Sequence, residues 1–390
     1  MLFFLSHPIQ YVSPLIRELS TYTKLKVYYY GGQSAVNDDK GFGQKVTWDI
    51  PLLDGYDYLF MKNASSSKGM NTRFFDAINW SIFKVLRMSD DKIVIVNGWA
   101  YLSDWFVFIA AKLFGKKVWM RAEMPWNQEE MRPKSLKKTL KFLFFKYVFF
   151  KFFISKFLFI GTQNKKFYQA HGVIESRLIY APYAVENDRL QSQKTLSNEN
   201  RERWGISKDD FVILFSGKLI EKKRPLDLLF AFHQLDVENA VLFFMGDGPL
   251  RRELDEYITT FKLKRVIISG FINQSEIASI YSLADVFVMC SGIGETWGLS
   301  VNEAMNFSLP IIVSAVCGCS HDLIDDGDNG FIFNEGDVVT LKTHIDNLLQ
   351  NKGMRLQMGQ ASKSKIVQFS HQITCDNIIT RISKDKNFFG

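Results

Sequence analysis

The chain has 390 residues, of which 47% are hydrophobic and 23% charged, with a net charge of +7 and an isoelectric point near 9.0. This length favours two or three domains, and the apolar content excludes a chain that is disordered over most of its length. Four cysteines in so long a chain exclude a disulfide scaffold, and their spacing predicts no zinc site. The basic balance favours anionic partners: nucleotides, phospholipids or nucleic acid.

The N-terminal residues predict a cytoplasmic protein. MLFFLSHPIQY lacks a basic n-region, a long apolar h-region and a cleavage site, so no signal peptide is expected. Nowhere does an uncharged apolar stretch reach the length of about 18 residues that a membrane-spanning helix needs.

Short apolar runs alternate with helical patterns along the first half, which is typical of parallel α/β units. The predicted strands are Leu2–Leu5, Lys26–Tyr30, Asp91–Asn97, Val118–Ala122, Phe157–Gly161 and Leu178–Ala181. Helices are predicted at Val12–Thr21 and Leu102–Phe114, and Gly115 is placed to cap the second one. We assign residues 1–185 to an N-terminal domain.

Residues 186–209 are polar and nearly free of aliphatic side chains, so they are predicted to be a linker. The α/β pattern then restarts over residues 210–369. Its predicted strands are Phe211–Phe215, Ala240–Met245, Val266–Ile268, Val286–Met289, Ile311–Val313 and Gly330–Phe333. The sequence therefore predicts an α/β protein of two doubly wound, Rossmann-like domains facing a cleft, with ligands at the carboxyl ends of the strands.

The segment SGIGETWGLSVNEAMNFSLP gives the strongest chemical signal. Glu295 and Glu303 flank Gly298, which lets backbone approach a ligand, and a helix predicted to begin at Leu299 directs its free N–H groups at an anion such as a pyrophosphate. The two carboxylates suit sugar hydroxyls, one on a ribose and one on a transferred sugar. Two solvated glutamates at a helix end remain the alternative.

Two further loops follow predicted strands. Gly217 precedes a basic cluster that includes Lys218 and Lys223, which suits the charge developing on a leaving diphosphate; a solvated basic loop is the alternative. Gly246 and Gly248 form a tight turn that can serve as a backbone wall for a nucleobase, or simply as a turn. The only D-x-D pattern, in IDDGDNGF, predicts a turn, so no metal is expected.

Taken in order, these motifs resemble those of the family 4 (group 1) retaining glycosyltransferases, which have the GT-B fold. The resemblance covers about residues 210–365. It implies a metal-independent transferase whose donor substrate is a nucleoside diphosphate sugar with UDP or GDP, and which has no cofactor. It also implies that Lys218 and Lys223 are the basic pair, that Glu295 contacts the donor sugar and that Glu303 contacts the ribose. The donor-binding residues are then Gly217, Gly246, Gly248, Gly298, Leu299 and Glu303.

The N-terminal half matches the family more loosely. The glycine-rich loop of the family is replaced here by His7-Pro8-Ile9-Gln10-Tyr11. His7 and Gln10 in this loop are candidates for acceptor binding, as are Arg121 and Glu123 past a predicted strand end. The alternative for His7 is a residue that only forms a turn. The alternative for Arg121 and Glu123 is a structural salt bridge between them. The resemblance further implies that a helix over residues 370–388 packs back on the first domain.

A basic and aromatic segment in the first half predicts contact with a membrane. At 100° per residue its first four lysines share one helical face, and nearby phenylalanines are able to insert into lipid. The predicted membrane residues are Lys134, Lys137, Lys138, Lys141, Phe142 and Phe145. A solvated basic face over a packed helix is the alternative, and no nucleic-acid-reading module accompanies it, so no nucleic-acid partner is expected.

The sequence thus predicts a glycosyltransferase on the cytoplasmic face of the plasma membrane. It would move a sugar to a glycan or lipid-linked acceptor in the synthesis of a cell-surface polysaccharide or glycoconjugate. Two alternatives stay open: a nucleotide-sugar epimerase or hydrolase on the same fold, and a non-catalytic, membrane-associated partner subunit.

Overall fold

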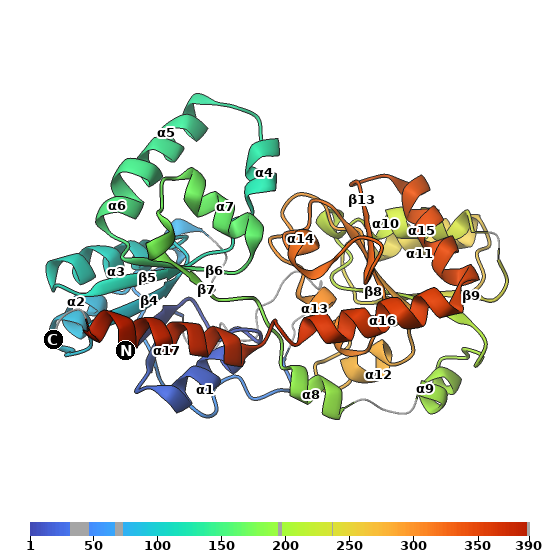
Figure 1. Cartoon of the computed structure of the whole chain (residues 1–390), viewed down its shortest axis with the longest axis horizontal. Helices are drawn as coiled ribbons and strands as arrows, with labels where there is room; N and C mark the ends of the chain where they lie inside the picture. Colours follow the sequence, from blue (N-terminus) through green and yellow to red (C-terminus); the bar gives the residue numbers. More distant parts are fainter. Residues whose placement is uncertain (32–46, 67–72, 194–196, 236, 388–390) are drawn as a thin grey trace. The chain divides into compact units, whose positions relative to one another are not determined.

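The structure is a computed structural model that describes residues 1–31, 47–66, 73–193, 197–235 and 237–387. The chain divides into two compact units (Figure 1). Unit 2 comprises Ala184–Ser370 with residues 47–50. Unit 1 comprises the rest of the N-terminal part through Tyr183, together with the residues from His371 onward.

Unit 1 is built on a seven-stranded sheet in the order β3-β2-β1-β4-β5-β6-β7, and every neighbouring pair is parallel. Its strands are β1 (Leu2–Leu5), β2 (Lys26–Tyr29), β3 (Asp57–Phe60), β4 (Ile93–Asn97), β5 (Lys117–Arg121), β6 (Lys156–Phe159) and β7 (Leu178–Tyr180). The central strands are nearly continuous apolar runs, because helices cover both faces of a parallel sheet. The strand order reverses between β1 and β4, so the loops after these strands lie where such sheets bind ligands.

Helices pack on both faces of this sheet. They are α1 (Ser13–Tyr22), α2 (Ser81–Met88), α3 (Leu102–Leu113), α4 (Trp126–Met131), α5 (Leu136–Phe144), α6 (Phe150–Phe152), α7 (Thr162–Ala170) and α17 (His371–Asn387). One core cluster includes side chains of α2 and α3, and a second joins α1 to α17. Helix α17 runs beside α1 in Figure 1 and also contacts β7. Residue 388, the predicted end of this helix, lies outside the described residues.

Unit 2 has a six-stranded parallel sheet in the order β10-β9-β8-β11-β12-β13. Its strands are β8 (Phe211–Ser216), β9 (Ala240–Met245), β10 (Val266–Ile268), β11 (Val286–Met289), β12 (Ile311–Ser314) and β13 (Gly330–Phe333). Its helices are α8 (Asn187–Ser192), α9 (Ser197–Arg203), α10 (Pro225–His233), α11 (Arg251–Thr260), α12 (Ile277–Tyr281), α13 (Leu299–Asn306), α14 (Ser320–Leu323), α15 (Val338–Gln350) and α16 (Lys352–Ile366). Two doubly wound α/β units are therefore present, and this part of the sequence prediction is confirmed.

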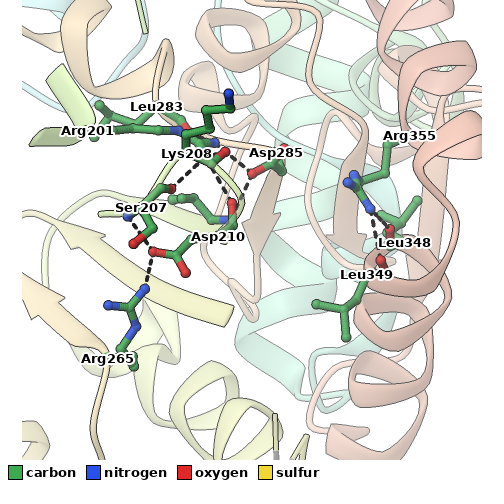
Figure 2. Close-up of polar contacts among 11 residues, drawn as sticks. Arg201, Ser207, Lys208, Asp210, Arg265, Leu283, Asp285, Leu348, Leu349 and Arg355 are labelled. Atoms are coloured by element: carbon green, nitrogen blue, oxygen red, sulfur yellow. Dashed lines mark hydrogen bonds and ion pairs between the residues drawn. The ribbon is translucent and has the colours of Figure 1, made fainter. Parts of the chain in front are cut away.

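The segment predicted as a linker, 186–209, folds largely as part of unit 2; residues 194–196 lie outside the described residues. Arg201 on α9 is buried and donates to the carbonyl oxygen of Leu283 and to the carboxylate of Asp285, as Figure 2 shows. It also donates to the carbonyl oxygen of Asp210, whose carboxylate pairs with Arg265. A polar segment therefore packs on the sheet through charge-assisted hydrogen bonds, which a low aliphatic content does not reveal.

The basic and aromatic segment divides into two parts. None of the residues of α5 is buried, and Lys134, Lys137 and Lys141 are exposed. Phe145, which the sequence places in lipid, instead begins a π-helical turn and is only 5% exposed within the core of unit 1. Phe142 is half-buried and lines a pocket of about 440 Å³. Within the described part of the chain, none of the helices is long and apolar enough to cross a bilayer.

Candidate active site

Three loops at the carboxyl ends of β8, β9 and β11 carry the residues that the motifs of unit 2 single out. Gly217 and Lys218 follow β8, Gly246 and Gly248 follow β9, and the segment 291–298 follows β11. Since β9, β8 and β11 are neighbours in the sheet, the topology brings these loops to one edge. This is the edge at which open parallel sheets bind ligands.

The loops after β8 and β9 lie backbone against backbone. A Cβ atom on Gly246 would sit 1.9 Å from the carbonyl oxygen of Gly217, and one on Gly248 would sit 2.6 Å from that of Leu219. Gly246 and Gly248 also have φ angles of 152° and 157°, which favour glycine. Hydrogen bonds of 3.0 Å from Gly217 N to Met245 O and 2.9 Å from Leu219 N to Asp247 O fix this contact. Glycine is therefore required in the second loop by packing alone.

A largely buried ion pair joins the loop after β8 to the loop after β11. The Nζ of Lys223 lies 2.5 Å from Oε2 of Glu295, and these side chains are only 15% and 10% exposed. Burial by itself lowers the pKa of Lys223, but Glu295 outweighs burial and the pKa is raised. Burial likewise raises the pKa of Glu295, but Lys223 and then Lys222 outweigh it and the pKa lies below its usual value. Both groups are thus charged at neutral pH.

Lys223 also lies against the start of its own loop, since its Nζ is 3.8 Å from a Cβ atom built on Gly217. Lys218 follows Gly217 directly and is partly buried. Arg224, from the same basic run, faces other groups: its Nε donates to Asp227 at 2.6 Å, and its Nη1 lies 3.6 Å from Glu335. Lys223 and Arg224 are neighbours in the basic run, but they therefore contact different acidic residues.

The segment between Glu295 and α13 is held by close backbone contacts. Gly298 has a φ of 113° and stands immediately before Leu299, the first residue of α13. The N–H of Gly318 donates to the carbonyl oxygen of Glu295 at 3.1 Å, and a Cβ atom on Gly318 would lie 1.8 Å from that of Thr296. The first N–H groups of a helix have no partner within the helix, so the start of α13 offers donors and a partial positive charge near the ion pair.

Glu303 lies one turn further along α13 and has its own partner. The hydroxyl of Tyr281, at the end of α12, donates to Oε2 of Glu303 at 2.7 Å. Burial raises the pKa of Glu303, and Tyr281 and the charge of Arg189 offset this only in part. Neither Tyr281 nor Arg189 stands out in the sequence, because neither belongs to a recognisable motif and both come from distant segments.

The potential metal-binding patterns of the sequence have structural explanations. In the described part of the chain, no group of three His, Cys, Asp or Glu side chains is arranged to hold a metal ion. Cys317 and Cys319 are buried, and burial raises the pKa of both thiols. Asp326 belongs to a turn: its Oδ1 accepts a hydrogen bond from Ile332 N at 2.8 Å, and Gly327 N donates to Gly330 O at 2.8 Å.

In unit 1, the four predicted acceptor residues follow strands that end at the same sheet edge. His7 and Gln10 follow β1, and the Nδ1 of His7 lies 3.0 Å from the hydroxyl of Ser6. Arg121 ends β5 and is buried, whereas Glu123 accepts a hydrogen bond from the hydroxyl of Tyr183. The alternative for these two residues, a structural salt bridge between Arg121 and Glu123, is not among the ion pairs of the described residues. Tyr183 is not among the residues predicted for the acceptor, and it ends the N-terminal part of unit 1.

Comparison with known proteins bears on the family of the second half of the chain. Residues 197–365 match the family described as glycosyl transferases group 1. The match covers less than half of the chain and lies within unit 2. The resemblance inferred from the motifs of the C-terminal half is thereby confirmed.

Two curated relatives match the chain at 33% identity. The alpha-monoglucosyldiacylglycerol synthase of Acholeplasma laidlawii aligns over 154 residues, which are 39% of this chain and 38% of that protein. The sulfoquinovosyl transferase SQD2 of Arabidopsis thaliana aligns over 132 residues, which are 33% of this chain and 25% of that protein. The chain therefore spans less than half the length of either relative.

The likeness in fold extends over the whole chain. HepE of Anabaena, solved in complex with UDP and glucose, superimposes with a TM-score of 0.73 at 15% identity and covers 98% of this chain and 99% of its own. At this identity the comparison concerns the fold alone. The chain has the GT-B fold of such glycosyltransferases, as the sequence predicts.

Proposed function

We propose that the protein is a retaining glycosyltransferase that moves a sugar from a nucleoside diphosphate sugar to a glycan or lipid-linked acceptor. The observation that carries this proposal is the Lys223–Glu295 ion pair, which joins two strand-end loops beside the start of α13. The group 1 domain over residues 197–365 supports a nucleotide-sugar donor, and the UDP bound by HepE supports a uridine nucleotide; GDP is the alternative. The reaction needs no cofactor and no metal ion in this proposal.

Each site residue has a chemical task in this reaction. As the bond between the sugar and the diphosphate breaks, negative charge develops on the leaving phosphate, and the ammonium groups of Lys218 and Lys223 meet it together with the first N–H groups of α13. The carboxylate of Glu295 accepts hydrogen bonds from the hydroxyls of the donor sugar, and that of Glu303 accepts them from the ribose. Gly217, Gly246, Gly248 and Gly298 let the backbone approach the nucleotide.

In this proposal the acceptor binds unit 1 at His7, Gln10, Arg121 and Glu123. The name of one curated relative, an alpha-monoglucosyldiacylglycerol synthase, supports a lipid-linked acceptor. The exposed face of α5 supports peripheral attachment to an anionic membrane, with Lys134, Lys137 and Lys141 next to exposed leucines. We place the enzyme on the cytoplasmic face of the plasma membrane, in the synthesis of a surface polysaccharide or glycoconjugate.

The experiment first identifies the donor and then measures transfer. Thermal shifts with UDP, GDP and their sugars select the donor, because a ligand that binds only the folded form raises the melting temperature. Transfer of radiolabelled sugar from that donor to membrane lipid and glycan extracts is then followed with and without EDTA, and proton NMR of the product gives the anomeric configuration. We expect Lys223→Met to lower kcat by about 10²–10³-fold, and the surface variant Lys342→Met to leave it unchanged.

The outcomes separate the alternatives. Sugar found only as an isomerised donor or as free sugar would indicate an epimerase or hydrolase. Donor binding without any turnover would indicate a non-catalytic subunit. Full activity of Lys223→Met would contradict the assigned site.

A further inference from the structure

One arginine of unit 1 is buried without an ion pair. Arg121, the last residue of β5, is only 2% exposed. Within the described part of the chain its one hydrogen bond is long, 3.5 Å from Nη1 to Oδ1 of Asn97 at the end of β4. Among the described residues, no carboxylate forms an ion pair with Arg121, and its buried Nε has no hydrogen-bond acceptor.

Such an arrangement is unfavourable unless a ligand completes it. A guanidinium group stays protonated in proteins, and a buried charge without a counter-charge is strongly destabilising. Burial lowers the pKa of Arg121, with only partial compensation by the nearby charge of Glu123. Glu123 itself accepts the hydroxyl hydrogen bond of Tyr183. The carboxylate whose charge acts on Arg121 thus accepts a hydrogen bond from a tyrosine.

One face of the guanidinium is covered by an aromatic ring. The ring of Tyr183 lies over it, 4.3 Å from ring centroid to Cζ, and Tyr11 packs against Tyr183 at 5.5 Å. The ring covers the face of the guanidinium and leaves its in-plane N–H groups uncovered, and the N–H of Nε has no acceptor among the described residues. This edge has the spacing that binds a carboxylate or phosphate through two parallel hydrogen bonds.

Two more buried polar atoms near this sheet edge lack partners within the described residues. They are Oε1 of Gln10, in the loop after β1, and Nε2 of His371, at the start of α17. Burial and then the charge of Arg121 lower the pKa of His371 to about 4, so the ring is neutral at pH 7 and can donate a hydrogen bond to an anion. Gln10, Asn97 and Arg121 follow or end β1, β4 and β5, adjacent strands beside the switch point of the sheet.

We propose that Arg121 is an anion-binding residue of the acceptor subsite, where its guanidinium edge pairs with a phosphate or carboxylate group of the acceptor. This inference rests on the proposed function, in which unit 1 binds the acceptor, and it adds the chemical class of the group that is recognised. A neutral glycan lacking such a group is then a poor acceptor. Phosphate on a lipid-linked acceptor and carboxylate on an acidic sugar share the chemistry that Arg121 recognises.

The test uses the full chain, saturated with UDP so that the phosphate site of unit 2 is filled. Melting temperatures are measured while inorganic phosphate and, separately, acetate are titrated. We expect one or both anions to stabilise the wild type, and Arg121→Gln to weaken that response by about ten- to a hundredfold in apparent Kd. Arg87→Gln, which removes one exposed arginine of unit 1, is the matched control and keeps the response.

The melting temperature without anion is the second readout. A binding arginine without an ion pair should leave Arg121→Gln as stable as the wild type or more stable, whereas a structural arginine should leave it much less stable. If Arg121→Gln does not fold, Arg121→Lys is measured instead. It keeps the positive charge but loses the two parallel N–H donors, so weaker stabilisation by the anions supports the proposal. The proposal is overturned if neither anion raises the melting temperature of the wild type, or if an Arg121 variant is stabilised by the anions as much as the wild type is.

The separate titrations with phosphate and acetate identify the anionic group of the acceptor. A response to phosphate alone points to a phosphorylated acceptor, and a response to acetate alone points to an acidic sugar; both support the anion site. Stabilisation by UDP is read in the same runs. If UDP binds and the anions do not, the acceptor inference fails while the donor proposal stands; if UDP fails in every variant, the donor proposal fails.

Discussion

Lys223 and Glu295 combine two properties at the scale of single residues. They lie where the proposed reaction develops charge, and their side chains are only 15% and 10% exposed. A buried ion pair adds little net stability relative to an apolar pair, but removing one partner leaves the other charge buried and uncompensated. In the proposed reaction, the same two groups therefore hold the two loops together and supply the charges of the site.

We expect Lys223→Met to lower the free energy of unfolding by about 3–5 kcal/mol, because it leaves the buried Glu295 carboxylate without its counter-charge. The double variant Lys223→Met/Glu295→Gln should recover much of this loss. Lys342→Met is the control, because Lys342 pairs with Asp346 in a half-exposed i,i+4 pair worth about 0.3–0.5 kcal/mol. Urea denaturation measures all three. If the double variant is no more stable than Lys223→Met, Lys223 and Glu295 do not stabilise each other in the way expected here.

The same pair predicts a pH dependence. The pKa of Glu295 is lower in the folded state, so its contribution is present above the unfolded pKa of about 4.3 and is lost as the pH falls through the folded pKa. The pKa of Lys223 is higher in the folded state, so its contribution is present below about 10.4 and is lost as the pH rises through the folded pKa. The stability difference between wild type and the double variant should thus be flat from about pH 5 to 10.

At the scale of elements, α5 stands apart because it leaves a row of apolar side chains in water. Leu136 and Leu140 are 76% and 58% exposed, and Leu143 and Tyr147 continue the same face at helical spacing. Lysines 134, 137 and 141 are exposed beside this row. Such a face matches the boundary between lipid headgroups and acyl chains.

We expect this helix to bind anionic vesicles. Leu140→Asp should weaken co-sedimentation with vesicles of phosphatidylglycerol and phosphatidylcholine by about tenfold, because it removes an inserting side chain and adds a repelled charge. Leu113→Asp, an equally exposed leucine on α3, should bind as the wild type does. Binding should also fall as salt rises. Equal binding to pure phosphatidylcholine would remove the electrostatic part of the argument.

How far the sequence predicts the elements depends on where their partners lie. The apolar runs predict the strands of both sheets because a strand buried on both faces is apolar throughout. The loop glycines and Glu295 are predictable because each belongs to a recognisable motif, even though their contacts join separate loops. By contrast, the buried position of Phe145 depends on a π-helical turn, and the anchoring of α9 depends on Arg201 meeting groups more than 80 residues away. Local sequence patterns do not predict contacts between residues that are far apart in the chain.

At the scale of the whole molecule, the last helix completes the core of the first unit. Cys375 and Ile378 of α17 belong to the same buried cluster as Leu15 and Leu19 of α1, although more than 350 residues separate them in sequence. Unit 2 has a separate core cluster of its own, which includes residues of β8, β9 and α15. A chain with two such cores need not unfold in one step.

We therefore expect Ile378→Ala to destabilise unit 1 selectively. Removing this fully buried side chain leaves a cavity between α17 and α1 and should cost about 2–5 kcal/mol, whereas Leu113→Ala, which truncates an exposed leucine of the same unit, should be nearly neutral. Calorimetry with and without UDP assigns the transitions, because a ligand bound by unit 2 raises the transition of that unit. The transition that UDP leaves unchanged should move down in Ile378→Ala. A downward shift of the UDP-responsive transition instead would mean that the last helix stabilises the nucleotide-binding unit, and the assignment of α17 to unit 1 in solution would have to be abandoned.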